Sequence, residues 1–160
     1  MSLVLVRIDC RLIHGQVLET WVPHVRSDCV LVADDQLASN ELQKTILCMS
    51  VPGKIHLEID TVETLVRKLL ANRWEKNRVL LLFSDCQGAQ RAFSMGLHFT
   101  SINLGNVHFE EGCRQVTPSV ALSRNDLTCL RELSASGVQV ECRAVPNEKP
   151  FFLEDVLRIR

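Results

Sequence analysis

Short apolar runs that alternate with segments of helical spacing constrain the fold of this chain more than any other feature. Most of the runs are rich in Val, Leu and Ile and are bounded by charged residues, as is typical of buried strands. Six runs cover residues 3–8, 29–33, 54–59, 78–83, 101–104 and 139–143. Because strands that alternate with helices need crossover connections, the order predicts a mainly parallel sheet with helices on both faces.

The segments between these runs carry the expected helices. Apolar residues at helical spacing follow Gly15, and Pro23 ends or kinks that helix early. Further helices are expected over residues 37–49, 60–70, 87–95 and 123–137. Asp60 and Glu63 have the spacing of a capping box, and Ser123 caps the last of these helices.

The alternation breaks in the last third of the chain. Over residues 107–122, a turn at Glu111-Gly112 and Pro118 indicate short irregular or antiparallel strands, and a tail from Phe151 adds a short helix. No linker, repeat or low-complexity tract divides the sequence. We therefore expect one α/β domain over residues 1–160, an open, mainly parallel sheet with an antiparallel or irregular C-terminal edge.

Composition excludes several classes of protein. A formal net charge of −1 gives no support for binding nucleic acid through bulk positive charge. No apolar run approaches membrane length, so we expect a cytoplasmic protein. The seven cysteines form no Cys-x-x-Cys pair and the five histidines are scattered, which predicts neither a disulfide framework nor a metal site.

The loop after the first apolar run carries the residues best suited to chemistry. In open parallel sheets, ligands bind beyond the carboxyl ends of the strands, where loops run into helix N-termini. Arg11 and His14 lie in that loop, and Gly15 begins the next helix. A phosphoryl group on His14 would face unsatisfied helical N–H groups, and Arg7 and Arg11 could neutralise its oxygens. Alternatively, His14 only caps the helix and an arginine beside Asp9 forms a solvated ion pair; composition leaves both interpretations open.

Polar residues after two other runs, and one cysteine, are further candidates. Asp35 leaves the second run at the same sheet edge as His14, where it orients the ring or simply forms a turn. Ser84 follows the fourth run and either lines a pocket or caps a helix. Cys10 is an alternative nucleophile, but a loop with cysteine followed six residues later by arginine is absent because position 16 is Gln.

The segment from Arg7 to Val17, followed by Trp21, resembles the active-site loop of the IIB components of the mannose/fructose/sorbose family of the sugar phosphotransferase system (PTS). The resemblance extends through most of the chain, in the same order as in that family. It includes Val32-Ala33-Asp34-Asp35, Glu41-Leu42-Gln43-Lys44-Thr45, Leu81-Leu82-Phe83, Ile102-Asn103-Leu104-Gly105 and Gln115-Val116-Thr117.

The resemblance implies a protein-Nπ-phosphohistidine–sugar phosphotransferase. It implies that His14 accepts phosphate from a phosphorylated IIA protein and donates it to a sugar held by membrane IIC and IID components. Arg11 matches a charge-stabilising arginine, while Gly15 and Gln16 complete the loop. No cofactor, neither metal nor nucleotide, is implied, because the donor is an activated phosphoramidate. Homo-oligomerisation is left open.

Two positions depart from the family pattern. Cys10 stands where the family usually has a second acidic residue, and Asn106 stands where it tends to have a second glycine. The loss of a carboxylate beside the histidine removes one negative charge from the pocket. Two other functions therefore stay open: a regulatory phosphorelay protein that serves no sugar transport, and a non-catalytic anion-binding scaffold.

Overall fold

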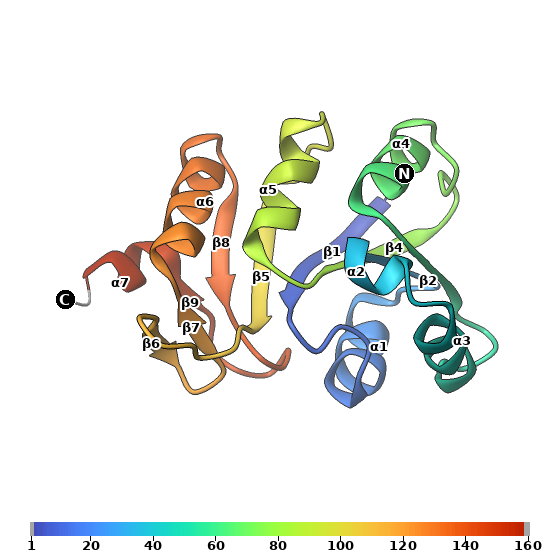
Figure 1. The fold of residues 1–160 in the computed structure, drawn as a ribbon, viewed down its shortest axis with the longest axis horizontal. Coiled ribbons are helices and arrows are strands. Elements are labelled where there is room, and N and C mark those ends of the chain that lie inside the picture. Colours follow the sequence, from blue (N-terminus) through green and yellow to red (C-terminus); the bar gives the residue numbers. More distant parts are fainter. Residues whose placement is uncertain (1, 159–160) are drawn as a thin grey trace.

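A seven-stranded sheet forms the centre of the computed structural model, which describes residues 2–158 (Figure 1). The strand order is β3-β2-β4-β1-β5-β8-β9, and only the short edge strand β9 runs antiparallel to its neighbour. The strands are β1 (Ser2–Asp9), β2 (Cys29–Ala33), β3 (His56–Asp60), β4 (Arg78–Phe83), β5 (Ser101–Asn106), β8 (Gln139–Cys142) and β9 (Phe151–Phe152). The predicted mainly parallel α/β sheet with an antiparallel C-terminal edge is confirmed.

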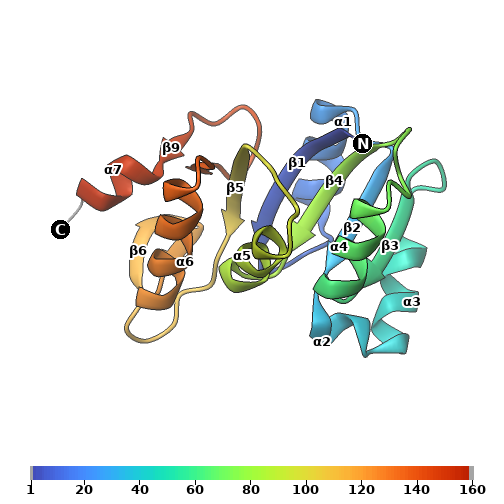
Figure 2. The same cartoon turned by 90° about the horizontal axis from the view of Figure 1, so that it is seen from above.

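Helices cover both faces of this sheet (Figures 1 and 2). One face carries α4 (Val62–Leu70), α5 (Cys86–Ser94) and α6 (Arg124–Ala135). The other carries the π-helix η1 (Gln16–Trp21), which continues into α1 (Val22–Val25), together with α2 (Asp35–Ala38) and α3 (Glu41–Ser50). A last helix, α7 (Leu153–Arg158), follows β9. No helix in residues 2–158 is long and apolar enough to cross a membrane.

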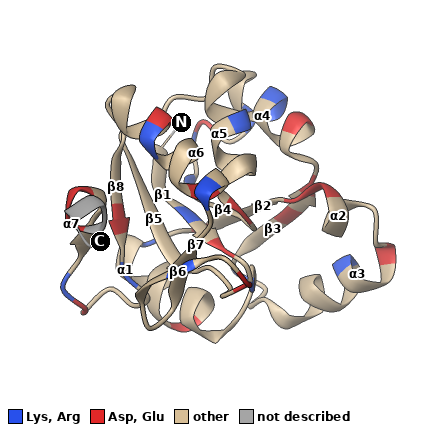
Figure 3. Cartoon of the chain, turned by 60° about the vertical axis from the view of Figure 1, so that its left-hand side comes forward, with Lys and Arg blue, Asp and Glu red and all other residues tan. Residues whose placement is uncertain are grey.

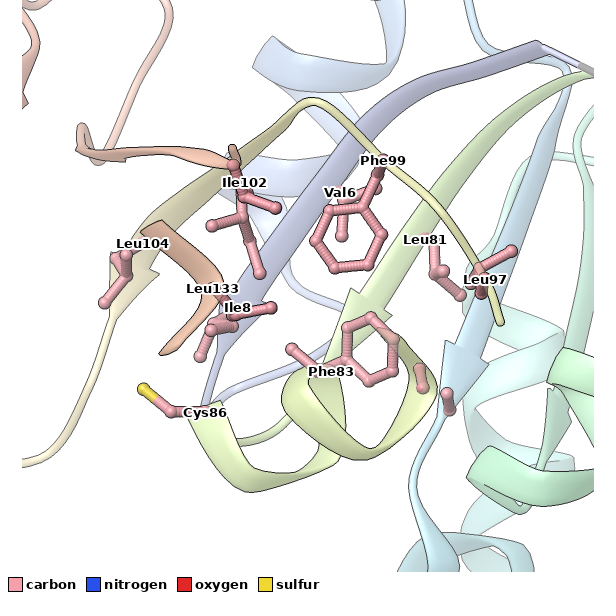
Figure 4. Close-up of a cluster of buried hydrophobic side chains, with 14 of the residues drawn as sticks. Val6, Ile8, Leu81, Phe83, Cys86, Leu97, Phe99, Ile102, Leu104 and Leu133 are labelled. Atoms are coloured by element: carbon pink, nitrogen blue, oxygen red, sulfur yellow. The ribbon is translucent and has the colours of Figure 1, made fainter. Parts of the chain in front are cut away.

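The central strands β2 and β4 send alternate side chains into two separate apolar clusters, one on each face. Ile8 of β1, Phe83 of β4 and Leu104 of β5 point into the cluster beneath α5 and α6 (Figure 4). Leu80 and Leu82 of β4 point into the opposite cluster. Because Val79 to Phe83 are fully buried, β4 is a central strand, as its uninterrupted apolar sequence predicts.

Two details of the helices differ from the sequence-based expectations. The helix expected over residues 37–49 is two helices, since Asn40 accepts a hydrogen bond from the amide of Gln43 (3.0 Å) and begins α3. The cap of α4 is Thr61, whose hydroxyl accepts from the amide of Thr64 (3.1 Å), and not Asp60. At α6, the capping box between Ser123 and Asp126 is present.

Residues 107–122 contain the antiparallel pair that the sequence indicates. Strands β6 (Arg114–Thr117) and β7 (Val120–Leu122) form a two-stranded sheet beside β5. The turn before β6 uses Gly112 at φ +87°, a conformation that favours glycine. In Figure 3 the positions of basic and acidic residues are interspersed along the ribbon, in keeping with the near-zero net charge.

Candidate functional site

The loop after β1 lies at a point where neighbouring connections diverge. From β1 the chain turns towards β2, whereas from the adjacent β5 it continues to the opposite side, towards β8. Loops that separate in this way leave a crevice at the carboxyl ends of a parallel sheet, the usual place for a ligand. A hollow of about 240 Å³ opens here, lined by Cys10, Arg11, Asn106, Val107, His108, Phe109, Gln115, Pro118 and Ser119.

The carboxylate of Asp9, the last residue of β1, is the centre of the site. It is fully buried, and its Oδ2 atom accepts hydrogen bonds from His14 Nε2 (2.7 Å), Arg7 Nη2 (3.0 Å) and Asn106 Nδ2 (3.0 Å). Its Oδ1 atom accepts from the amide of Arg11 (2.9 Å). Burial alone would raise the pKa of Asp9, but the hydrogen bond from His14 and the charge of Arg7 outweigh it. The pKa is therefore held below its ordinary value of 3.8, and the carboxylate stays ionised.

The imidazole of His14 is fixed by this carboxylate. Because an ionised carboxylate can only accept, the 2.7 Å contact requires a proton on Nε2 and leaves the lone pair of the neutral ring on Nδ1. His14 Nδ1 is buried and has no hydrogen-bond partner among the described residues. The whole side chain is 9% exposed. The nucleophilic nitrogen is thus unpaired but covered.

Arg7 lies behind Asp9 in the protein interior and not on the loop surface. Its guanidinium is fully buried and donates to Asn103 Oδ1 (2.6 Å) and to the backbone oxygens of Arg143 (3.2 Å) and Ala144 (3.1 Å), as well as to Asp9. Burial lowers the pKa of Arg7, and the negative charge of Asp9 opposes that effect. With all three of its nitrogens engaged, Arg7 supports Asp9. The expectation that it contacts phosphoryl oxygens directly is wrong for this structure.

Trp21 links Arg7 to the C-terminal part of the chain. Its indole Nε1 donates to the backbone oxygen of Ala144 (2.8 Å), and its ring is almost fully buried. The guanidinium carbons of Arg7 and Arg143 lie 5.2 and 5.1 Å from the ring centre, within the range of cation–π attraction. Trp21 is thus a buried anchor of this part of the core.

The loop that carries His14 is fixed by buried side chains before the histidine and by the helix η1 after it. Leu12 and Ile13 are buried in the cluster beneath η1, and Leu12 adopts φ +55°, an unusual conformation for a residue with a Cβ. After His14, the backbone turns at the exposed Gly15 directly into η1, and no side chain caps this helix start. The positive end of the helix dipole therefore lies next to His14. The amides of Val17 and Leu18 already donate to the backbone oxygen of His14 (3.1 and 3.0 Å), which corrects the expectation of unsatisfied N–H groups for these two amides.

Arg11 and Gln16 occupy different positions around the histidine. Arg11 is exposed, and among the described residues its guanidinium has neither an ion pair nor a hydrogen bond, so it is free to meet an anion. Gln16 is half-buried; its Oε1 accepts from Asn106 Nδ2 (3.1 Å) and from Arg7 Nη2 (3.4 Å). Gln16 thus belongs to the network that surrounds Asp9.

Asp35 and Ser84 lie at the same sheet edge but in another hollow. Asp35 pairs with Arg91 (2.9 Å) and caps the amide of Val62 (2.9 Å), while Ser84 donates to the carboxylate of Asp34. All of these residues line a hollow of about 600 Å³ between the ends of β2 and β4. No hydrogen bond joins Asp35 or Ser84 to the described loop of His14, which corrects the expectation that Asp35 orients the ring. Ser84 lines a hollow, but not the one beside His14, and the cap of α5 is Asp85.

Cys10 is poorly suited to be the nucleophile. It is half-buried, and burial together with the neighbouring charge of Asp9 raises the pKa of its thiol. Since the thiolate is the reactive form of cysteine, a raised pKa lowers its nucleophilicity near neutral pH. In the described part of the chain, no group of three His, Cys, Asp or Glu side chains is placed to hold a metal ion.

Sequence reasoning missed the two asparagines of β5. Asn103 is almost fully buried and binds Arg7, and Asn106 binds Asp9 and Gln16. A signal for Asn103 exists in the sequence, because a polar side chain within the apolar run Ile102-Asn103-Leu104 must find a buried partner. Asn106 stands out only as a departure from the family pattern, which says nothing of its contacts.

The fold and the site define a class: a parallel α/β protein whose first strand-to-helix loop presents a histidine aligned by a buried carboxylate. Comparison with known proteins gives the family. The sequence model of the PTS system sorbose subfamily IIB component matches residues 3–160, so the chain belongs to this family of phosphotransferases, whose members work with other PTS components in sugar phosphotransfer.

Individual relatives agree with this assignment. The chain is 30% identical to the fructose-specific EIIB component of Bacillus subtilis, over 99% of this chain and 97% of the relative. It is 29% identical to the mannose-specific EIIAB component of Escherichia coli K12; the match covers 98% of this chain but about half (49%) of that longer protein. The IIB domain of the sorbose permease from Klebsiella pneumoniae superposes with a TM-score of 0.93, at 25% identity, over 100% of this chain and 99% of that domain.

Proposed function

We propose that His14 is the residue on which this IIB component carries phosphate, and that the acceptor atom is Nδ1. The observation that carries the proposal is the 2.7 Å contact between His14 Nε2 and the buried Asp9. That contact assigns the proton to Nε2 and the nucleophilic lone pair to Nδ1, which has no hydrogen-bond partner among the described residues. Asp9 also favours the positive charge that develops on the ring when Nδ1 is phosphorylated.

The transfer step follows from this arrangement. The Nδ1 lone pair attacks the phosphorus of a phosphohistidine on a IIA protein, and the N–P bond of the donor breaks with its electron pair left on the donor nitrogen. The exposed Arg11 and the positive end of the helix dipole after Gly15 neutralise the oxygens of the phosphoryl group. Because Nδ1 is covered, residues 10–15 open when the donor docks.

The second half-reaction passes the same group on. In this proposal the acceptor is a hydroxyl of a sugar held by membrane IIC and IID components, at the cytoplasmic side of the membrane. The hydroxyl oxygen forms the new P–O bond and its proton passes to solvent water, while the pair of the breaking N–P bond returns to Nδ1. Asp9 keeps Nε2 protonated throughout, so the ring leaves in the neutral form that accepted the phosphate.

Labelling with a phosphorylated IIA protein tests the carrier role. Wild type should gain one acid-labile, base-stable phosphate, and His14→Ala should gain none. A matched control is His56→Ala, since His56 is an exposed histidine on the far edge strand β3; this variant should label like wild type. Wild type that stays unlabelled with several IIA donors, or His14→Ala that labels normally, would remove the carrier role.

Sugar transfer needs a second arm of the same experiment. Phosphorylated wild type should lose its phosphate to sugar when membranes that contain IIC and IID are added, and should keep it with membranes that lack them. Phosphorylation of His14 without any IIC- or IID-dependent sugar phosphate would instead identify a regulatory phosphorelay protein and exclude the transport function.

A further inference from the structure

A β-bulge at Gly105 brings Asn106 into the site. The pairing of β1 with β5 runs in register from Arg7 opposite Asn103 to Ile8 opposite Leu104, and then skips Gly105 so that Asp9 lies opposite Asn106. One extra residue on a strand reverses the side to which later side chains point. Asn106 therefore faces the same side as Asp9, where an unbulged strand would have turned it away. A backbone bond from Cys10 N to Asn106 O (2.9 Å) holds it there.

The bulge also makes room for Arg7. A Cβ atom on Gly105 would lie 1.9 Å from the guanidinium carbon of Arg7, so only glycine leaves space for that side chain. Gly105 and Arg7 are thus fitted to one another at the point where the register shifts. As a result, the positions of Arg7 and Asn106 around Asp9 are both set by the backbone of β5.

The side-chain amide nitrogen of Asn106 donates within the site. Its Nδ2 atom donates to Asp9 Oδ2 (3.0 Å) and to Gln16 Oε1 (3.1 Å). The oxygen that it binds on Asp9 is the same atom that accepts from His14 Nε2. Asn106 and His14 therefore donate to the same oxygen atom. Each of these hydrogen bonds makes that oxygen a weaker acceptor for the other.

We propose that Asn106 is a positioning residue that weakens the hydrogen bond from His14 to Asp9 and thereby makes phosphate leave His14 more easily. The inference rests on the proposed function, in which His14 carries the phosphate. A carboxylate oxygen that accepts fewer bonds pulls harder on the Nε2 proton, which places more electron density on the ring. More density strengthens the N–P bond of the phosphorylated ring and makes it a poorer phosphoryl donor. Because Asn106 donates to the same carboxylate oxygen, it weakens the pull on the Nε2 proton and lowers the electron density on the ring. Phospho-His14 is then a better phosphoryl donor.

Removal of the Asn106 amide tests this. Asn106→Ala and Asn106→Gly both delete the donor, and Asn106→Gly adds no Cβ that could disturb the bulge. The control is Asn125→Ala, an exposed asparagine on α6. Two quantities are compared with wild type: the proton resonance of His14 Nε2–H in the unphosphorylated protein, and the lifetime of phospho-His14 formed with the small donor phosphoramidate.

Both Asn106 variants should move the Nε2–H resonance downfield, because the bond to Asp9 becomes stronger. Their phospho-His14 should live about fivefold longer, the effect of one hydrogen bond of ordinary strength. Asn125→Ala should match wild type in both. A purely structural role of Asn106 would lower the melting temperature without moving the resonance downfield, and that result overturns the proposal.

The experiment separates this inference from the proposed function. If wild type takes no phosphate on His14 from phosphoramidate or from phosphorylated IIA, the carrier role fails. If wild type is phosphorylated normally but both Asn106 variants keep the wild-type resonance and lifetime, only the role of Asn106 fails.

Discussion

Two hollows at the carboxyl edge of the sheet look alike in topology and differ in chemistry. Each lies where neighbouring connections diverge, one between β1 and β5 and the other between β2 and β4. Asp9 lies behind the lining of the first hollow, where it is fully buried and bound by Arg7, Asn106 and His14. Asp35 at the second is 53% exposed and pairs with an equally exposed arginine.

The difference shows that topology alone does not select the reactive site. An exposed carboxylate is screened by water and has little power to direct the proton of a neighbour. A buried carboxylate with several charged and polar donors fixes a histidine tautomer, because in a low-dielectric environment each of those hydrogen bonds is stronger. The comparison assigns the chemistry to the β1 loop and a structural role to Asp35.

The largest expected effect is on phosphorylation rate and stability when the carboxylate of each region, Asp9 or Asp35, is replaced by asparagine. Asp9→Asn removes the charge that orients His14, so phosphorylation by IIA should slow by at least about 100-fold. It also leaves Arg7 buried without its counter-ion, which should lower the free energy of unfolding by about 3 kcal/mol. Phosphorylation kinetics and urea unfolding measure the two effects.

Asp35→Asn is the matched control for Asp9→Asn. Its ion pair with Arg91 is exposed, so the free energy of unfolding should change by less than about 1 kcal/mol, with phosphorylation close to the wild-type rate. Equal losses of rate in the two variants would contradict the distinction between the hollows.

The next effect in size concerns the glycine at the bulge. Gly105→Ala places a Cβ against the guanidinium of Arg7 and should cost about 2 kcal/mol of unfolding free energy through overpacking. Gly53→Ala serves as control, because a Cβ on Gly53 meets nothing within 4 Å. Thermal unfolding of both proteins checks the pair; a Gly105→Ala protein as stable as wild type would show that Arg7 is not confined by β5.

Loss of a single hydrogen bond should give a smaller effect. Trp21→Phe keeps a buried aromatic ring near Arg7 but loses the bond from Nε1 to the backbone oxygen of Ala144. We expect a loss of about 1 kcal/mol in unfolding free energy. Denaturant titration measures it, and an unchanged midpoint would mean that the segment after β8 is held by its other contacts.

The smallest expected effect is in the pH dependence of stability. The folded pKa of Asp9 lies below its unfolded value, so its contribution is complete above that unfolded value, 3.8, and is lost as the pH falls through the folded pKa. Below about pH 4, wild type should therefore lose stability faster than Asp9→Asn, whose side chain does not titrate. Parallel curves for the two proteins in acid would show that Asp9 does not titrate differently on folding.

The sequence predicted the sheet well because its central strands β2 and β4 are apolar on both faces. The uninterrupted apolar run over residues 78–83 predicts a central strand, and β4 is fully buried from Val79 onwards. The split between α2 and α3 was missed because the periodic residues Leu42, Ile46 and Met49 continue the helical pattern, although they are exposed in the structure. Periodicity alone does not show that Asn40 restarts the helix with its own side chain.

The site was only partly predictable from the sequence. The position of the first loop and the choice of His14 could be predicted from the strand order and from the family motif. Both are patterns of residues that lie close together in the sequence. The role of Arg7 depends on the bulge at Gly105 and on the backbone oxygens of Arg143 and Ala144, more than 130 residues away in the chain. No local pattern contains contacts of that kind, so a buried arginine at the end of an apolar strand was taken for a phosphate ligand.

The most direct test of the account is to identify the phosphorylated atom by ¹⁵N and ³¹P NMR of the protein labelled at its histidines. We expect phosphate on Nδ1 of His14, with Nε2 still protonated and bonded to Asp9. Phosphate on Nε2 of that ring, on Cys10 or on another histidine would contradict it.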